Sequence, residues 1–586
     1  MGNRNEISRR GFLRLSATGA LAVGAAAVLA ACGGTSAAST PASGSLAANP
    51  AASGQSVGAA ASAKAPAAVK LPTTQPVAGL TPDLPGAPDG SIDPAWQSYP
   101  KNPIKTVPNP PGKGGDITFT LSITGNPPPP ADQNALWTAV NKDIGANLKF
   151  NFVPFADYKT TRLPTLIAGG DLPDVLFIQP QTPLPGFPDF LKLKCTDLTP
   201  YLSGDGVKDY PNLASIPQTA WKNTVFNNAI WGVPVDYPLY LWVLWAHQEV
   251  LDEAGIPLPK SADDFKKALM AVNKPQQQQW GMSFEKDYGF GSLVGFWPAM
   301  FGSGPTWTVD KSGKFIYAAE SDAFKAGISF AKDLYAAGLF HPNTVTNDVS
   351  TKRNDFVARR FVFDFDGFIN ASRVLFWPSI NNFKPPAKYS VVTPFSDDGK
   401  RQPIFWPGQP GQTGSFGFVI LKQAPADRIK EILGVLNYIA APLGSQEYKL
   451  THFGVEGTDH TLDDKGNPVL TAKGKTEATL PWPGTVEQEN VIYYPTAQDY
   501  APTLQDAEKR IKPFNVMDAS VGLYSETYTS KGVPMQQDLA DAINQVIRGS
   551  QPMSSFDQAI SDWKSKGGDK MRAEFQQAYA AAQGGA

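Results

Sequence analysis

Residues 115–178 read GDITFTLSITGNPPPPADQNALWTAVNKDIGANLKFNFVPFADYKTTRLPTLIAGGDLPDVLFI. Three segments of this stretch have the character of β-strands. Residues 115–121 alternate polar and apolar side chains, residues 148–153 show a second such pattern, and residues 174–178 form a short apolar run. Alternation predicts a strand with one buried face, and a continuous apolar run predicts a strand that is buried on both faces.

Helical patterns separate these strands. Leu136, Val140 and Ile144 recur on one helical face, and Asp132 is placed to cap the start of that helix. A second helical segment at residues 163–168 ends at a pair of glycines. The order strand, helix, strand, helix, strand predicts an α/β fold with a parallel sheet and right-handed crossovers.

The rest of the chain adds helices and turns. Ser261 is a predicted N-cap for a helix that carries Phe265, Leu269 and Val272 on one face. Similar spacing predicts three later helices, through Phe324, Ile328, Ala331 and Tyr335, through Leu539, Ile543, Val546 and Ile547, and through Phe556, Ile560 and Trp563. Residues 311–314 and 463–467 read as hairpin turns. Residues 115–586 number roughly 470, which is too many for one hydrophobic core, so two lobes are expected.

The N-terminus carries export signals in a fixed order. Residues 8–14, SRRGFLR, form a twin-arginine signature, and an uncharged, alanine-rich run follows from Leu15 to Ala31. Leu29-Ala30-Ala31-Cys32 then resembles the lipobox of bacterial lipoproteins. This resemblance implies cleavage before Cys32 and a lipid on its sulfur. An ordinary apolar signal peptide with an incidental cysteine is the alternative.

Composition changes abruptly after Cys32. Up to about residue 115 the chain is rich in Ala, Ser, Thr, Gly and Pro, with almost no aromatic residues before Trp96. Such a segment buries too little apolar surface to offset the entropy of ordering, so we expect a disordered tether with a reach of roughly 50 Å. If Cys32 carries lipid, Cys195 has no disulfide partner and is expected to be an inert thiol.

Charge and motifs exclude several classes of protein. The net charge is −2, and no basic stripe with interleaved aromatic residues suggests nucleic-acid binding. The four histidines do not pair at metal or triad spacings, and the sequence has no G-x-S-x-G elbow, P-loop or dinucleotide fingerprint. Asp310 begins a loop that only partly resembles a calcium loop. No metal, cofactor or catalytic residue is therefore predicted, although a glycosidase pair of carboxylates stays open.

Aromatic residues are the positive signal for function. Many of the thirteen tryptophans stand at turns beside Gly and Pro. Flat aromatic rings match the apolar face of a sugar, and neighbouring polar side chains match its hydroxyl groups. The candidate ligand-binding residues are Trp231, Asp236, Tyr237, Tyr240, Trp245, Trp297, Asp366, Phe368 and Trp406. Trp242 and Phe363 lie in apolar runs and are expected in the core.

Several short motifs occur in an order typical of one family. They are GDLPDV (170–175), WGVP (231–234), EVLDEAGIP (249–257), DLYAAGL (333–339), HFGVEG (452–457) and WKSKGGD (563–569). Together they make residues 115–580 resemble the extracellular solute-binding proteins of carbohydrate ABC transporters, especially the large lipoprotein members. Sugar-binding members often carry an aromatic–Asn–Lys run where this chain has Trp245-Ala246-His247-Gln248, so the identity of the ligand does not transfer.

The resemblance implies a periplasmic-binding-protein fold, with two α/β lobes, a hinge and an interlobe cleft. The expected division is a signal peptide (1–31), a lipidated tether (32–114), lobe one (115–241), lobe two (242–389), a return segment of lobe one (390–421), and the remainder of lobe two with the C-terminal helices (422–586). The chain is thus expected to cross near Trp242, to return near Tyr389–Val392, and to cross again after Leu421.

The resemblance also implies a function without catalysis. We expect a monomeric protein, lipid-anchored through Cys32 to the outer face of the bacterial cell membrane. It would capture a sugar or oligosaccharide and deliver it to ABC permease subunits. An exported carbohydrate-active enzyme and a solute-sensing lipoprotein are the alternatives, and peptide or lipid-linked solutes also remain open.

Overall fold

The structure, a computed structural model, describes residues 69–584 apart from 124–125, 180–181, 183, 286–287, 409–411, 479–484, 487–489 and 496. All of these belong to the unit Lys64–Ala586. The expected signal peptide, Cys32 and the tether up to residue 68 lie outside the described residues. No helix within the described residues is long and apolar enough to cross a membrane.

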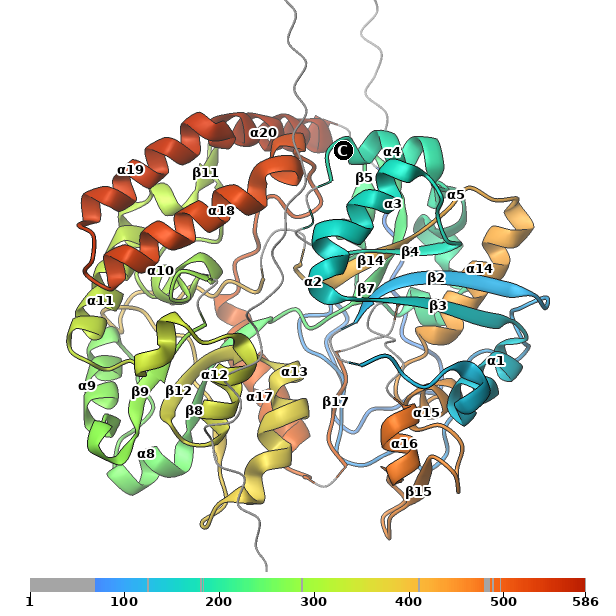
Figure 1. Cartoon of the computed structure of the whole chain (residues 1–586), viewed down its shortest axis with the longest axis horizontal. Coiled ribbons are helices and arrows are strands. Elements are labelled where there is room, and N and C mark those ends of the chain that lie inside the picture. Colours follow the sequence, from blue (N-terminus) through green and yellow to red (C-terminus); the bar gives the residue numbers. More distant parts are fainter. Residues whose placement is uncertain are drawn as a thin grey trace, which may run out of the picture. The chain divides into compact units, whose positions relative to one another are not determined.

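A five-stranded sheet forms the first lobe, with the strand order β3-β2-β4-β14-β7 (Figure 1). Its strands are β2 (Asp116–Ile123), β3 (Asn147–Pro154), β4 (Val175–Ile178), β7 (Gly232–Asp236) and β14 (Ser415–Leu421). β2 pairs parallel with β3 and β4, as predicted, whereas β14 runs antiparallel to β4 and β7.

Helices of the first lobe follow the predicted apolar spacing. α1 (Ala135–Ile144) buries Leu136, Val140 and Ile144. Its N-cap is Asn134, whose side chain accepts a hydrogen bond from the Trp137 N–H, and not the expected Asp132. α3 (Leu163–Gly169) ends at Gly170, whose left-handed φ of 73° suits a residue without a Cβ.

The four-stranded sheet of the second lobe has the order β13-β8-β12-β9. Its strands are β8 (Trp242–His247), β9 (Trp280–Ser283), β12 (Phe361–Gly367) and β13 (Tyr389–Val391). α9 (Ala262–Val272), capped by Ser261 as predicted, and α11 (Asp322–Ala336) bury their apolar faces in the core on one side of this sheet. α18 (Glu526–Ile547), α19 (Met553–Trp563) and α20 (Asp569–Gly584) contribute to the same core and are coloured red in Figure 1.

The lobe boundaries differ from expectation at two places. β13 pairs with β8, and Val392, Phe395 and Trp406 lie in the core of the second lobe. The return to the first lobe therefore comes between Trp406 and β14, not near Tyr389–Val392. After β14 the chain stays in the first lobe, because α14 (Ala426–Ile439) buries its apolar face in the core that α1 shares. The expected crossing directly after Leu421 is wrong for this reason.

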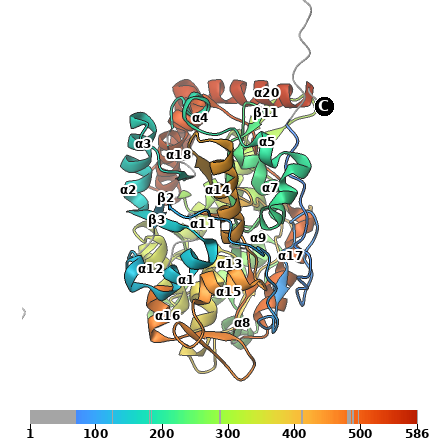
Figure 2. The ribbon, with the colours of Figure 1, turned by 90° about the vertical axis from the view of Figure 1, so that its right-hand side faces the viewer.

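Residues 69–114, here called the N-terminal strap, pack on the body of the protein. The Thr73 N–H donates to the Gly204 carbonyl at 2.9 Å, and the Ile104 N–H donates to the Gly444 carbonyl at 3.0 Å. β1 (Ala95–Trp96) pairs parallel with β17 (Ile492–Tyr493). Figure 2 shows the strap in blue, passing α7 (Gln218–Trp221) and α17 (Tyr500–Ile511). The expectation of a disordered tether is therefore wrong for residues 69–114.

The body supplies the partners that the composition of the strap lacks. Trp96 and Tyr99 are buried with Leu443, Tyr448 and Tyr493 in a small separate core. The Glu447 carboxylate accepts hydrogen bonds from the backbone N–H groups of Thr106 and Val107. Apolar burial and satisfied backbone groups thus offset the entropy of ordering, although neither comes from within the segment.

Buried carboxyl groups attach the strap where the two lobes join. Asp236 ends β7, Asp93 belongs to the strap and Glu508 lies on α17, and all three are buried. The Asp93 N–H donates to Glu508 Oε2 at 2.8 Å, and the Asn490 amide donates to Asp93 Oδ1 at 3.1 Å. Burial raises the pKa of Asp93 to about 7, and burial together with the nearby Asp93 raises the pKa of Glu508 well above its ordinary value.

The strap is expected to contribute to stability. Trp96→Ala should lower the free energy of unfolding by about 3 kcal/mol, because it empties a buried aromatic site. Lys101→Ala, an exposed substitution in the same segment, should leave that free energy unchanged. Urea unfolding of both variants measures the difference. A Trp96→Ala protein as stable as the wild type would show that the strap is a tether after all.

The buried carboxyl cluster predicts a pH dependence of stability. The pKa of Asp93 is about 7 in the folded protein and near 4 ordinarily. At pH values between about 4 and 7, the folded protein therefore binds more protons than the unfolded chain. Stability should therefore fall as the pH rises from about 5 to 7. Asp93→Asn should reduce this fall, as measured by the melting temperature from pH 5 to pH 8. The exposed substitution Asp263→Asn is the control, and an equal slope in Asp93→Asn would contradict the prediction.

Candidate functional site

A cavity of about 430 Å³ lies between the two lobes. The first lobe lines it with Phe155, Lys159, Gln179, Tyr237, Ser415 and Phe416. The second lobe lines it with Trp242, Tyr288, Arg353, Gly367, Asn370 and, from α18, Gln536 and Gln537. Ligands of α/β proteins commonly bind outside the carboxyl ends of strands, which here are the ends of β3, β4, β7 and β12.

Two of the crossovers between the lobes, at residues 237–241 and 407–414, lie side by side next to this cavity. The Leu241 N–H donates to the Pro407 carbonyl at 2.9 Å, and the Tyr237 N–H donates to the Gly414 carbonyl at 3.3 Å. Ser415 at the start of β14 is in register with Asp236 at the end of β7. The first of these crossovers runs from the end of β7 at Asp236 to the start of β8 at Trp242.

Aromatic side chains form a pair on each lobe. Tyr237 and Phe416 of the first lobe have ring centroids 5.3 Å apart, and Trp242 and Tyr288 of the second lobe have centroids 5.7 Å apart. Phe155 adds a large apolar side chain that is 38% exposed. Apolar ring surface is thus available from both sides of the cavity.

Amide groups provide hydrogen-bonding capacity. Asn370 donates from Nδ2 to the Tyr237 hydroxyl at 3.3 Å, which joins the two lobes across the cavity wall. Gln179 follows β4 and is only 2% exposed. Neither its Oε1 nor its Nε2 has a hydrogen-bond partner among the described residues. A buried amide without partners is costly, so Gln179 is suited to a polar ligand or an ordered water.

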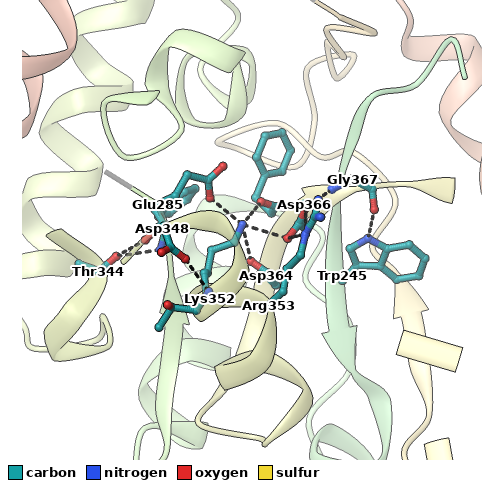
Figure 3. Close-up of polar contacts among 12 residues, drawn as sticks. Trp245, Glu285, Thr344, Asp348, Lys352, Arg353, Asp364, Asp366 and Gly367 are labelled. Carbon is teal, nitrogen blue, oxygen red and sulfur yellow. Dashed lines mark hydrogen bonds and ion pairs between the residues drawn. The ribbon is translucent and has the colours of Figure 1, made fainter. Parts of the chain in front are cut away.

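A charged cluster supports the wall of the second lobe (Figure 3). Lys352 Nζ lies 2.7 Å from Glu285 Oε2, 3.1 Å from Asp364 Oδ1 and 3.3 Å from Asp366 Oδ2. Arg353, the next residue, pairs with Asp366 through Nε and Nη2 at 2.9 and 2.7 Å. These contacts hold the guanidinium of Arg353 in place at the cavity.

The pKa values of the two aspartates in this cluster are shifted in opposite directions. Burial alone would raise the pKa of Asp366, but Lys352 and Arg353 outweigh burial and lower it to about 2. Burial raises the pKa of Asp364 well above its ordinary value, despite the adjacent Lys352. Asp366 is thus the ionised partner of both cations.

The nine candidate residues from the sequence are distributed unevenly around the site. Tyr237 lines the cavity, and Asp366 reaches it only through Arg353. Asp236 and Tyr240 are buried beside the strap, where the Tyr240 hydroxyl donates to the Ser91 carbonyl. The other five lie in or against hydrophobic cores: Trp231, Trp245, Trp297, Phe368 and Trp406.

Strand alternation explains the main difference from expectation. Leu244 and Ala246 of β8 face the core that contains α9, whereas Val243 and Trp245 face the opposite core. Trp242, expected in the core, is at the start of this strand and lines the cavity. The position of Trp242 directly after the predicted crossover was the feature of the sequence that could have placed it at the cavity. Nothing local marked Gln179, Lys159 or Arg353, because their position depends on how the two lobes meet.

Other groups considered for chemistry are placed away from the cavity. Cys195 is buried in the core of the first lobe, and burial raises the pKa of its thiol to about 12. The thiolate that a nucleophile requires is therefore disfavoured. Within the described residues, no group of three or more His, Cys, Asp or Glu side chains is arranged to hold a metal ion.

Comparison with known proteins agrees with this architecture. Residues 128–442 match the family model described as bacterial extracellular solute-binding protein. The chain is 23% identical over 479 residues to lipoprotein LipO of Bacillus subtilis, covering 78% of this chain and 90% of LipO. It is 22% identical over 479 residues to the polygalacturonan/rhamnogalacturonan-binding protein YtcQ of the same organism, with the same coverage.

Solved structures show the same fold. An HMO-binding, ABC-transporter-associated solute-binding protein from Bifidobacterium longum infantis superimposes with a TM-score of 0.59 at 13% identity, covering 80% of this chain and 99% of that protein. The predicted periplasmic-binding-protein-like fold is confirmed. Because the family model covers more than half of the chain, the protein is a member of the bacterial extracellular solute-binding protein family.

Proposed function

We propose that the protein is the substrate-binding component of an ABC importer and that it binds an oligosaccharide in the cavity between its lobes. The observation that carries the proposal is the cavity itself, which has an aromatic pair on each lobe and the buried amide of Gln179, for which the described residues provide no hydrogen-bond partner. Its volume of about 430 Å³ is in the range of small-molecule sites. Relatives named as sugar-binding and transporter-associated support the same function.

Binding would couple to movement of the lobes. A sugar held between Tyr237 and Phe416 on one side and Trp242 and Tyr288 on the other makes its full set of contacts only when the lobes are close. The ligand therefore favours the closed form by its differential affinity, and the closed form would be the state that a permease recognises. No chemical step on the ligand is required.

The enzyme alternative receives less support from the cavity. Glycoside hydrolysis usually requires two carboxyl groups flanking the bond. None of the described residues that line the cavity is Asp or Glu. Asp366, the carboxylate behind the wall, is engaged by Lys352 and Arg353.

A sensor of the same solute would use the same cavity, and loss of oligosaccharide uptake on deletion of the gene would favour the importer.

The aromatic platform is open to a direct test. A thermal-shift screen of oligosaccharides first finds a ligand, since one present at 100 times its Kd stabilises the fold by about 2.7 kcal/mol. Trp242→Ala should then weaken binding by about 2 kcal/mol, because it removes stacking area from the second lobe. Trp231→Ala is the matched control, since Trp231 packs against the core of the first lobe. Calorimetry in which both variants bind like the wild type would exclude the cavity as the sugar site.

The anchor is a second part of the proposal. We infer lipidation of Cys32 from the lipobox-like Leu29-Ala30-Ala31-Cys32, and a relative named as a lipoprotein agrees with it. Cys32→Ser should move the protein from the membrane fraction to the soluble fraction without changing its melting temperature. Fractionation with immunoblotting, and mass spectrometry of the N-terminus, measure this. A variant that stays with the membrane would contradict lipid anchoring.

A further inference from the structure

The ionisable side chains of the cavity are unusual in their sign. Among the described residues that line it, the side chains charged at neutral pH are Lys159 of the first lobe and Arg353 of the second. Neutral amides and aromatic rings make up most of the remaining lining. Because the described lining holds a cation from each lobe and no carboxylate, the cavity favours a negatively charged ligand.

Lys159 has no carboxylate counterion among the residues that the structure describes. It lies half-buried on the helical turn after β3, and none of the described carboxylates is within ion-pair distance of its ammonium group. Burial lowers the pKa of Lys159, which shows that the surroundings disfavour its charge. Closing the lobes over a neutral ligand would desolvate this ammonium further, whereas an anionic ligand would compensate it.

Arg353 is held in a fixed orientation and still has a group that can donate hydrogen bonds to a ligand. Its Nε and Nη2 bind Asp366, while Nη1 makes no hydrogen bond to any described residue. A guanidinium fixed on one side is suited to receive a second carboxylate on the other. Lys352 also contacts Asp366, in addition to its shorter contacts with Glu285 and Asp364.

We propose that the cavity selects an acidic oligosaccharide, with uronate carboxylates received by Lys159 from the first lobe and by Arg353 from the second. This rests on the proposed function and names the substrate class. The aromatic pairs take the apolar faces of the sugar rings, and the amides of Gln179, Gln536 and Gln537 take hydroxyl groups. Because the two cations belong to different lobes, an acidic ligand favours closure more than a neutral ligand of the same shape.

The test compares matched ligands on the purified, folded protein. The probes are di- to tetrasaccharides of uronic acids and the same oligosaccharides with each carboxyl group reduced to a primary alcohol. Isothermal calorimetry should give affinities at least ~10-fold higher for the acidic series. Raising the salt concentration from 50 to 500 mM should weaken binding of the acidic series only.

Variants assign the effect to the cavity. Lys159→Gln and Arg353→Gln should each weaken binding of the acidic oligosaccharide by ~10-fold or more, with little effect on a carboxyl-reduced one. Arg353→Lys, which retains the charge, should recover part of the loss. Lys149→Gln is the matched control, because Lys149 is exposed on β3 of the same lobe and does not line the cavity.

The outcomes separate this inference from the proposed function. Preferred binding of the carboxyl-reduced series that is lost in Trp242→Ala would overturn the acidic specificity and leave the oligosaccharide-binding function standing. Acidic ligands that bind equally well to wild type and Lys159→Gln would also overturn it. Binding of neither series would overturn the oligosaccharide-binding function and this inference together.

Discussion

The position of β14 organises the molecule. This strand lies between β4 and β7 and pairs with both, so that the backbone groups of two strands inside the first sheet are satisfied by a segment more than 170 residues further along the chain. Without β14, both strands would present unpaired backbone groups within the protein. The chain must therefore leave the first lobe, build the second sheet, and come back through the same place.

That return creates the cavity. Because Ser415 is in register with Asp236, the end of β7 and the start of β14 are neighbours, and the crossovers at residues 237–241 and 407–414 are joined by the hydrogen bond from the Leu241 N–H to the Pro407 carbonyl. Tyr237 and Phe416 extend from these two ends, and Trp242 begins the next strand. The aromatic wall of the site is thus a consequence of strand pairing, and it stands where the chain passes between the lobes.

The strap and the charged cluster contribute in different ways to this arrangement. The strap contacts the first lobe at Thr73, then α17 at Asp93, and then the first lobe again at Thr106, which binds Glu447 of α15 (Gln446–Phe453). The Lys352–Arg353–Asp366 cluster is a buried ionic network, whose net contribution to stability is small because desolvation opposes attraction. Its clearest effect is geometric, because it fixes the position of Arg353 at the cavity.

Local elements and the family resemblance could be predicted from the amino-acid sequence. The apolar spacing of α1 and α9, the Ser261 cap and the parallel order of β2, β3 and β4 follow from periodicity and capping, which act within a few residues. The ordered motifs were sufficient for the two-lobed fold. Three features became visible only in the folded protein: residues 69–114 pack on its body, Trp242 and not Trp245 lines the cavity, and Lys159, Gln179 and Arg353 meet there. Each of these depends on partners from distant parts of the chain, as with Thr106 and Glu447, and a local pattern carries no information about a contact that forms only when two separate cores come together.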